Sequence, residues 1–289
     1  MAKETKYGLR EFKAEFPDDD ACLAFLFNAR HTKECSCGGV YTRLKGRKQY
    51  QCSKCRFQIA PMTGTIFEKS SSPLTLWFHA MFIFSNGKSG ISAKEMERQL
   101  NVTYKTAWRM LHLIRKSLKQ SGVKLNGTVE ADESYHGGKG DSGICNKNQS
   151  KVMKAKTKVV TAIERGGDTK AQVIPRASRS ILQQFIRRNV QEGASLFTDG
   201  SWAYPEQGFD RGFVEHGRKQ WTKERPDGQV VHINSVESFT AHVKRSIKGT
   251  HKVVSKKHFQ EYLNAFVWLR NNRHNDRLRF GALVSLLAS

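Results

Sequence analysis

Residues 129–139 read VEADESYHGGK, and this stretch decides how the second half of the chain is interpreted. After the β-branched lead-in at Val129, three acids follow within four residues, Glu130, Asp132 and Glu133. The chain is otherwise strongly basic, with 49 Lys and Arg against 26 Asp and Glu and a formal net charge of +23. Acids clustered on a predicted strand of such a protein indicate a site for a cation.

The positive charge runs through most of the sequence, which favours a polyanion such as DNA as the partner, because neutralising phosphates releases condensed counterions. The alternative is a basic protein without a specific partner. A length of 289 residues allows two or three small domains. No apolar run reaches the roughly 18 residues that a membrane-spanning helix needs, and we find no signal peptide. We therefore expect a cytoplasmic, nucleoid-associated protein with no membrane partner.

Around the acidic stretch, the pattern from residue 127 onward predicts an α/β layer with a mixed sheet. The segments 157–165 and 169–176 flank Gly166-Gly167-Asp168, which is a hairpin signal. A helical pattern over 178–191 precedes short apolar strands at 194–200 and 211–217. Long helices are expected from about Ser235 and Lys256. Residues 1–30 are expected to hold one short amphipathic helix, roughly Asp18 to Phe27.

Four of the six cysteines fall within about twenty residues, in a C-x-C pair and a C-x-x-C pair joined by a basic stretch that predicts a β-hairpin. Four thiolates from two turns match a tetrahedral structural Zn²⁺ site, and metal binding would supply the folding free energy of so small a module. The expected ligands are Cys35, Cys37, Cys52 and Cys55. The C-x-C spacing leaves open whether His31 replaces Cys35, and four free thiols are the remaining alternative.

The region 73–120 has the layout of a helix-turn-helix, with a turn at Asn101-Val102 between its last two helices. In this motif the N-terminal residues of the second helix reach base edges in the major groove. Those residues are Lys105, Thr106 and Arg109. We assign Trp108 to the inward-facing apolar stripe of the same helix. A plain helical hairpin is the alternative, and the net charge favours DNA binding.

The candidate catalytic acids lie in three separate segments. Asp132 lies in the first predicted strand, and Asp199 ends a later one, where open α/β sheets place ligands. In the segment 232–245 a helix would place Asn234, Glu237 and Lys244 on one face, because they are three and seven residues apart. A carboxylate with a lysine two turns further along suits a metal ion and a phosphate.

Together these segments resemble the DDE transposases of bacterial insertion sequences, in particular the zinc-ribbon group that includes the fifteen-ninety-five insertion-sequence family. The resemblance covers nearly the whole chain. It rests on the cysteine module followed by MTGTIFE, on GISAKEMERQL and YKTAWRMLHLIRKSL, on DESYHGGK, on TDGSWAY, and on HINSVESF with the basic helices that follow. It implies an RNase H-like catalytic domain with Asp132, Asp199 and Glu237 as the acidic triad. Asn can take the third position in this group, and Asn234 could supply it.

The domains expected from motifs and resemblance are an N-terminal helical segment (1–30), a zinc ribbon (31–65), a helix-turn-helix (66–122) and an RNase H-like DDE domain with basic C-terminal helices (123–289). The resemblance implies cleavage and strand transfer of double-stranded DNA, with two Mg²⁺ (or Mn²⁺) ions as cofactors and a homodimer or higher oligomer on DNA. Lys244, Arg245 and Lys248 would contact the duplex. Two alternatives remain: a non-catalytic DNA-binding regulator, and a nuclease of the same fold without transposition.

Overall fold

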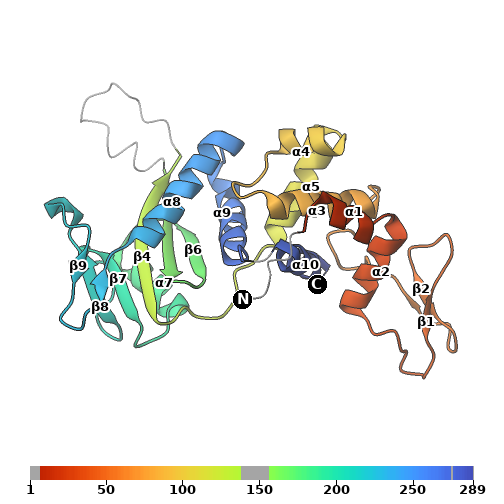
Figure 1. The fold of residues 1–289 in the computed structure, drawn as a ribbon, viewed down its shortest axis with the longest axis horizontal. Coiled ribbons are helices and arrows are strands. Elements are labelled where there is room, and N and C mark those ends of the chain that lie inside the picture. Colours follow the sequence, from red (N-terminus) through yellow and green to blue (C-terminus); the bar gives the residue numbers. More distant parts are fainter. Residues whose placement is uncertain (1–6, 138–155, 275, 289) are drawn as a thin grey trace. The chain divides into compact units, whose positions relative to one another are not determined.

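The computed structural model describes residues 7–137, 156–274 and 276–288 (Figure 1). The chain divides into two compact units. The first comprises Met1–Leu118 together with Asn272–Ser289, and the second comprises Lys119–Asn271.

The second unit is built on a five-stranded mixed sheet, which confirms the mixed α/β architecture expected of an RNase H-like domain. The strand order is β6-β5-β4-β7-β8. The first three strands pair antiparallel, and β4, β7 and β8 pair parallel. The strands are β4 (Thr128–His136), β5 (Thr157–Glu164), β6 (Thr169–Ile174), β7 (Ser195–Asp199) and β8 (Asp210–Val214).

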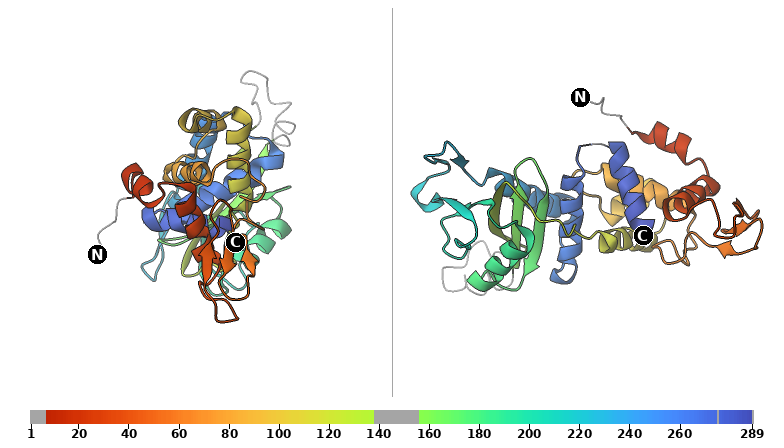
Figure 2. Two further views of the ribbon diagram at one scale, coloured as in Figure 1. Left: turned by 90° about the vertical axis from the view of Figure 1, so that its right-hand side faces the viewer. Right: turned by 90° about the horizontal axis from the view of Figure 1, so that it is seen from below.

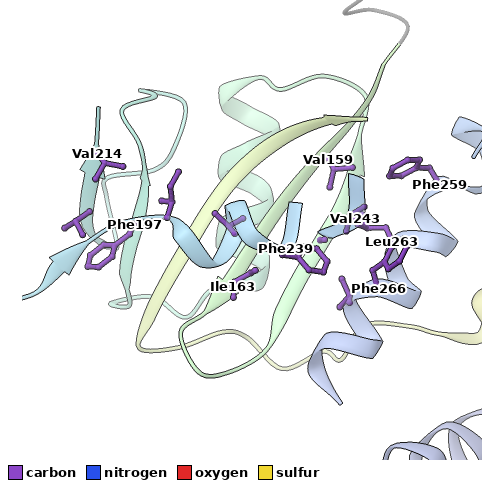
Figure 3. Packing of buried hydrophobic residues seen from close by; sticks show 14 residues of the cluster. Val159, Ile163, Phe197, Val214, Phe239, Val243, Phe259, Leu263 and Phe266 are labelled. Atoms are coloured by element: carbon purple, nitrogen blue, oxygen red, sulfur yellow. The ribbon is translucent and has the colours of Figure 1, made fainter. Parts of the chain in front are cut away.

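Helices cover both faces of this sheet, α7 (Arg179–Asn189) on one and α8 (Asn234–Ser246) with α9 (Lys256–Asn271) on the other (Figures 1 and 2). Side chains alternate between the faces of a strand. Val129 and Ala131 of β4 accordingly join the core under α7. On the opposite face, Phe239 of α8 and Leu263 of α9 pack in a second buried cluster (Figure 3). Even-numbered residues of β4 therefore face α8.

Before α8, a short two-stranded sheet of β9 (Lys223–Glu224) and β10 (Val230–Val231) follows β8. The chain then enters α8 at Asn234, close to the predicted start at Ser235. After α8 the backbone continues as a π-helical turn, Ile247–His251, before α9 begins at Lys256 as predicted.

From residue 7 onward, the described part of the first unit has two helices before the cysteine module, where the sequence predicted one. They are α1 (Leu9–Glu15) and α2 (Asp19–Arg30). Asp18 caps α2 by accepting a hydrogen bond from the N–H of Ala21 at 2.8 Å. The seven residues of α1 are too few for a clear helical period, and this helix is held by Phe12, whose ring stacks on Phe82 at 4.8 Å.

The cysteine module consists of three short strands, β1 (Tyr41–Arg43), β2 (Tyr50–Cys52) and β3 (Gln58–Ile59), in an antiparallel sheet. It contacts α2 through an aromatic stack, in which the ring centroids of Tyr50 and Phe27 are 4.0 Å apart, and through an ion pair between Arg43 and Asp20 at 2.7 Å.

Three helices follow the module: α3 (Leu74–Asn86), α4 (Ala93–Leu100) and α5 (Tyr104–Ser117). Ser92 caps α4, Asn101 ends it in the left-handed region at φ 51°, and Thr103 caps α5. Two capped helices joined by this tight turn give the helix-turn-helix arrangement.

The last helix, α10 (Asp276–Ala288), belongs to the first unit. Phe280 on α10 is 3% exposed and packs against Phe12, Phe16 and Phe78. The catalytic domain expected from the sequence runs to residue 289, whereas residues 272–289 group here with the N-terminal helices. The apolar residues of α10 predict that this helix is buried, but they do not indicate which of the two units it packs in.

Candidate active site and metal centres

The four cysteine sulfurs of the module lie together, all within 4.8 Å of one another. Cys35 and Cys37 come from the turn before β1, whereas Cys52 ends β2 and Cys55 lies in the turn that follows it. The Sγ atoms of Cys35 and Cys55 are 3.7 Å apart, and those of Cys37 and Cys52 are 3.5 Å apart. Tetrahedral Zn²⁺ with bonds of about 2.3 Å places its sulfurs roughly 3.8 Å apart. The four thiols therefore fit a structural zinc ion, and His31 is not in the group.

The surroundings of Cys35 and Cys52 favour their thiolates, and the backbone approaches the sulfur of Cys52 closely. The N–H of Lys54 donates to Cys52 Sγ at 3.4 Å. The backbone N–H of Cys37 and the hydroxyl of Tyr41 lower the pKa of Cys35 to about 6. A Cβ at Gly39 would lie only 2.5 Å from Cys52 Sγ, so this position accommodates no side chain without movement.

The helix-turn-helix presents a mixed basic and aromatic surface at the start of α5. Lys105 and Arg109 are exposed, and Tyr104 is 50% exposed. Thr106 is partly buried, and its backbone N–H donates to the Thr103 hydroxyl that caps the helix. The inward assignment of Trp108 is wrong. Trp108 is 41% exposed, because Ala107, Met110, Leu111 and Ile114 fill the buried stripe one position away on the helix.

In the second unit, strand register brings two of the predicted acids together. Glu130 of β4 pairs with Phe197 of the parallel strand β7. Asp132 and Asp199 each lie two residues further along, so they are neighbours on adjacent strands. Two steps along a strand return a side chain to the same face. Asp199 therefore shares the face of Phe197, which packs in the core under α8.

Helix α8 brings the third acid to the same region. A cleft of about 430 Å³ opens between β4 and α8. Its lining residues are Asp132, Glu133, Ser134, Tyr135, Lys156, Glu237, Thr240, Ala241 and Lys244. Glu237 and Lys244 thus line one face, as the seven-residue spacing predicted.

Electrostatic interactions tie the acids into one cluster. Burial, together with the charges of Glu133, Asp199 and Glu237, raises the pKa of Asp132 to about 7. Burial also raises the pKa of Glu133, which accepts a hydrogen bond from the Tyr204 hydroxyl at 2.7 Å. Convergent carboxylates whose mutual repulsion opposes ionisation are stabilised by a hard divalent cation. The oxygen donors present here fit Mg²⁺ or Mn²⁺.

The two candidates for the third position, Asn234 and Glu237, lie in different surroundings. Asn234 is the exposed first residue of α8, and its backbone N–H lies 3.4 Å from Nδ1 of His232. Its side chain is not among the residues that line the cleft, whereas Glu237 is. A carboxylate oxygen of Glu237 also lies 3.7 Å from Nδ1 of His216.

The cations expected to contact DNA lie toward the end of α8 and just beyond it. Lys244, Arg245 and Lys248 are all exposed, and Lys248 belongs to the π-helical turn after the helix. Lys244 also lines the cleft, so it joins the acidic cluster to this basic surface.

Glu130 has a different position from the one that the acidic stretch suggested. Its side chain is completely buried and does not line the cleft. It accepts hydrogen bonds from Arg165 Nε at 2.7 Å and from the backbone N–H groups of Ser235 at 2.7 Å and Val236 at 3.3 Å. The two-residue period predicted the face that it shares with Asp132, but local sequence carries no sign of partners 35 and 105 residues away.

Among the described residues, no helix is both long enough and apolar enough to span a bilayer. Within the described ranges, the four cysteines of the first unit are placed so that they could bind a metal ion.

Comparison with known proteins gives three findings. The profile of the ISXO2-like transposase domain matches residues 124–271. A protein of Halobacterium salinarum, described as an uncharacterized protein in transposable element ISH50, is 28% identical over 235 residues, covering 76% of this chain and 77% of its own. A chain in the cryo-EM structure of a simian T-cell lymphotropic virus intasome in complex with PP2A regulatory subunit B56 gamma matches with a TM-score of 0.28 and 13% identity. That match covers 66% of this chain and 65% of the other, and a score this low supports no inference.

Proposed function

Because this chain belongs to the ISXO2-like transposase domain family, we propose that it is a DDE transposase that binds transposon ends, cleaves them and transfers the cut strand into target DNA. The observation that carries this proposal is that Asp132 of β4 and Glu237 of α8 line one cleft, while Asp199 of β7 lies beside Asp132 on the adjacent strand and acts on its charge.

Asp132, Asp199 and Glu237 would hold the two divalent ions, with Asp132 as the central ligand. The bound ions would supply Lewis-acid activation of the attacking oxygen and stabilisation of the leaving oxygen in an in-line displacement. Glu237 is favoured over Asn234 because it lines the cleft and its charge acts on Asp132. A carboxylate also compensates the charge of the ions better than a neutral amide does.

Lys244, which faces the same cleft, would hold a non-bridging phosphate oxygen of the scissile group. In the first step water attacks the phosphodiester at the transposon end, which frees a 3′-OH and leaves a 5′-phosphate. In the second step that 3′-OH attacks a target phosphodiester, forms the new bond and releases a target 3′-OH. Each step exchanges one phosphodiester oxygen for another, so no covalent link between protein and DNA is required.

The first unit would recognise DNA. Lys105 and Arg109 are exposed in the first two turns of α5, where side chains of a helix-turn-helix reach base edges, and Thr106 lies between them. Arg245 and Lys248 would contact the backbone near the cleft. The four cysteines would hold Zn²⁺ to keep the ribbon folded. An element has two ends, so a homodimer or higher oligomer on DNA is part of the proposal.

The proposal is tested with Asp132→Asn and Asp199→Asn on a DNA that carries the element's end. Each variant should abolish Mg²⁺-dependent cleavage and retain DNA binding, because it removes an anionic ligand. Asp210→Asn is the matched control, since Asp210 lies at the far end of β8 and pairs with Arg225. Near-normal cleavage by either site variant would refute the metal-site assignment.

Two further outcomes separate the alternative functions. A wild-type protein that binds ends but never cleaves in Mg²⁺ or Mn²⁺ would be a regulator. One that cleaves but never joins ends to a target would be a nuclease.

The third position is tested by comparing Glu237→Gln with Asn234→Ala. If Glu237→Gln cleaves well and Asn234→Ala does not, Asn234 is the ligand.

A further inference from the structure

Glu130 is a fully buried carboxylate that belongs to neither metal centre, and its contacts suggest a purpose. It lies on the same face of β4 as Asp132, two residues earlier, which is about 6.6 Å along a strand. Its oxygens face the beginning of α8 rather than the cleft. A buried charge is costly unless its hydrogen-bonding capacity is filled.

The first partner of Glu130 is the N-terminus of α8. Ile233, the residue before the helix, provides no side-chain cap. Glu130 Oε2 instead accepts the N–H groups of Ser235 and Val236, and Oε1 accepts the Ser235 hydroxyl at 3.1 Å. A strand residue more than 100 positions away thus caps the helix, and its negative charge is favourable at the positive end of the helix dipole.

The second partner is Arg165, which follows β5. Its Nε donates to Glu130 Oε1 at 2.7 Å, and its two terminal nitrogens donate to the carbonyl oxygens of Val230 at 3.0 Å and His232 at 3.1 Å. The guanidinium therefore neutralises the carboxylate and also holds the backbone that leads into α8. The central carbon of the Arg165 guanidinium lies 4.9 Å from the centre of the Phe197 ring on β7, and this contact holds the guanidinium against the sheet.

These contacts set where Glu237 lies relative to Asp132. Glu237 is in the first turn of α8, directly after the two residues whose N–H groups bind Glu130. We propose that Glu130 is a positioning residue that fixes the rotation and height of α8 on β4, so that Glu237 faces Asp132 across the cleft. This inference rests on the proposed function, because it assumes that Asp132 and Glu237 bind a metal ion together.

The test is a double-mutant cycle on the affinity of the DNA-free full-length protein for Mn²⁺. We expect Glu130→Gln to raise the Kd about tenfold, as loss of a supporting partner typically does. Glu237→Gln should raise it by a similar factor. If Glu130 acts through Glu237, the double variant should be only about tenfold weaker than wild type, not about a hundredfold, because the effects of coupled residues do not add.

Amide hydrogen exchange supplies a second readout that does not depend on metal. Glu130→Gln should speed exchange at Ser235 and Val236, whose N–H groups lose their anionic acceptor. Ser235→Ala is a milder variant for use if Glu130→Gln does not fold, since it removes only the hydroxyl donor. It should weaken Mn²⁺ binding a few-fold, and again not in the Glu237→Gln background. The control Asp210→Asn breaks another carboxylate–arginine pair of the second unit and should leave the Kd unchanged.

The outcomes are distinct. Faster exchange with an unchanged Kd, or additive losses in the double variant, would overturn the positioning role and leave the metal site standing. If Asp132→Asn also leaves the Kd unchanged, the cleft is not the Mn²⁺ site, and the proposed function and this inference fall together.

Discussion

Substitution of Gly39 by alanine tests the zinc ribbon at its tightest point. The added methyl carbon would lie 2.5 Å from Cys52 Sγ and 2.8 Å from Lys54 Cβ. Contacts this short are not seen for real Cβ atoms, so either the sulfur or the turn that carries Lys54 has to move. Restoring an ordinary contact distance of about 3.5–4.0 Å requires a displacement of roughly 1 Å.

The expected magnitude follows from the cost of overpacking, which is about 1–3 kcal/mol. Folding of so small a module is coupled to metal binding, so the strain reduces zinc affinity. At about 1.4 kcal/mol per factor of ten, the Kd for Zn²⁺ should rise roughly 5- to 150-fold. The assay is competition for zinc against a chromophoric chelator.

Gly46→Asn is the matched control within the same module. Gly46 has φ +75° and no atom within 4 Å of an added Cβ, and asparagine tolerates this backbone conformation. The Gly46→Asn variant should bind zinc with the affinity of the wild-type protein. If Gly39→Ala also binds zinc within about twofold of wild type, the turn does not approach the sulfur as closely as the structure indicates, and the steric reasoning is refuted.

Three other outcomes are expected. Metal analysis should find about one zinc per chain, lost when Cys52→Ser and Cys55→Ser are combined, and a metal-free but folded ribbon would contradict the site. Arg109→Ala should weaken specific end binding more than nonspecific binding, whereas equal losses would indicate a phosphate contact. Burial lowers the pKa of His136 from 6.5 to about 4, so the unfolded chain takes up its proton first as the pH falls. The contribution of His136 to the free energy of unfolding should therefore fall by about 2.5 kcal/mol between pH 6.5 and pH 4. This loss should appear as the difference between wild type and His136→Gln, because the raised pKa of Asp132 acts in the opposite direction over the same pH range in both proteins.

Much of the second unit could be predicted from sequence because its signals are local. The hairpin at Gly166-Gly167-Asp168, the strand ending at Asp199 and the helix starting near Ser235 each follow from a few adjacent residues. The structure confirms the mixed sheet that these elements form. The seven-residue spacing of Glu237 and Lys244 on α8 likewise places both on the cleft, because helical periodicity is a local property.

Features that depend on distant packing could not be predicted. The pattern of α1 is too short to indicate a helix, and its position depends on rings such as Phe82 and Phe280 that lie far along the chain. Trp108 is apolar and next to a buried stripe, so its type suggested burial although its angle on the helix points outward. In each case, the local sequence does not show which part of the folded chain the segment packs against.

The acids of the opening stretch show the same limit at the scale of single side chains. The sequence places three acids close together, but the folded chain gives each of them different contact residues. Glu130 meets Arg165 and the N-terminus of α8, and Glu133 meets the Tyr204 hydroxyl. Asp132 accepts the N–H of Glu133 at 2.8 Å, but its burial, together with the charges of other acids, raises its pKa to about 7. Burial and the distribution of counter-charge, rather than the number of acids, therefore distinguish Asp132 from its two neighbours, and they are the reason that we propose it as a ligand of a divalent cation.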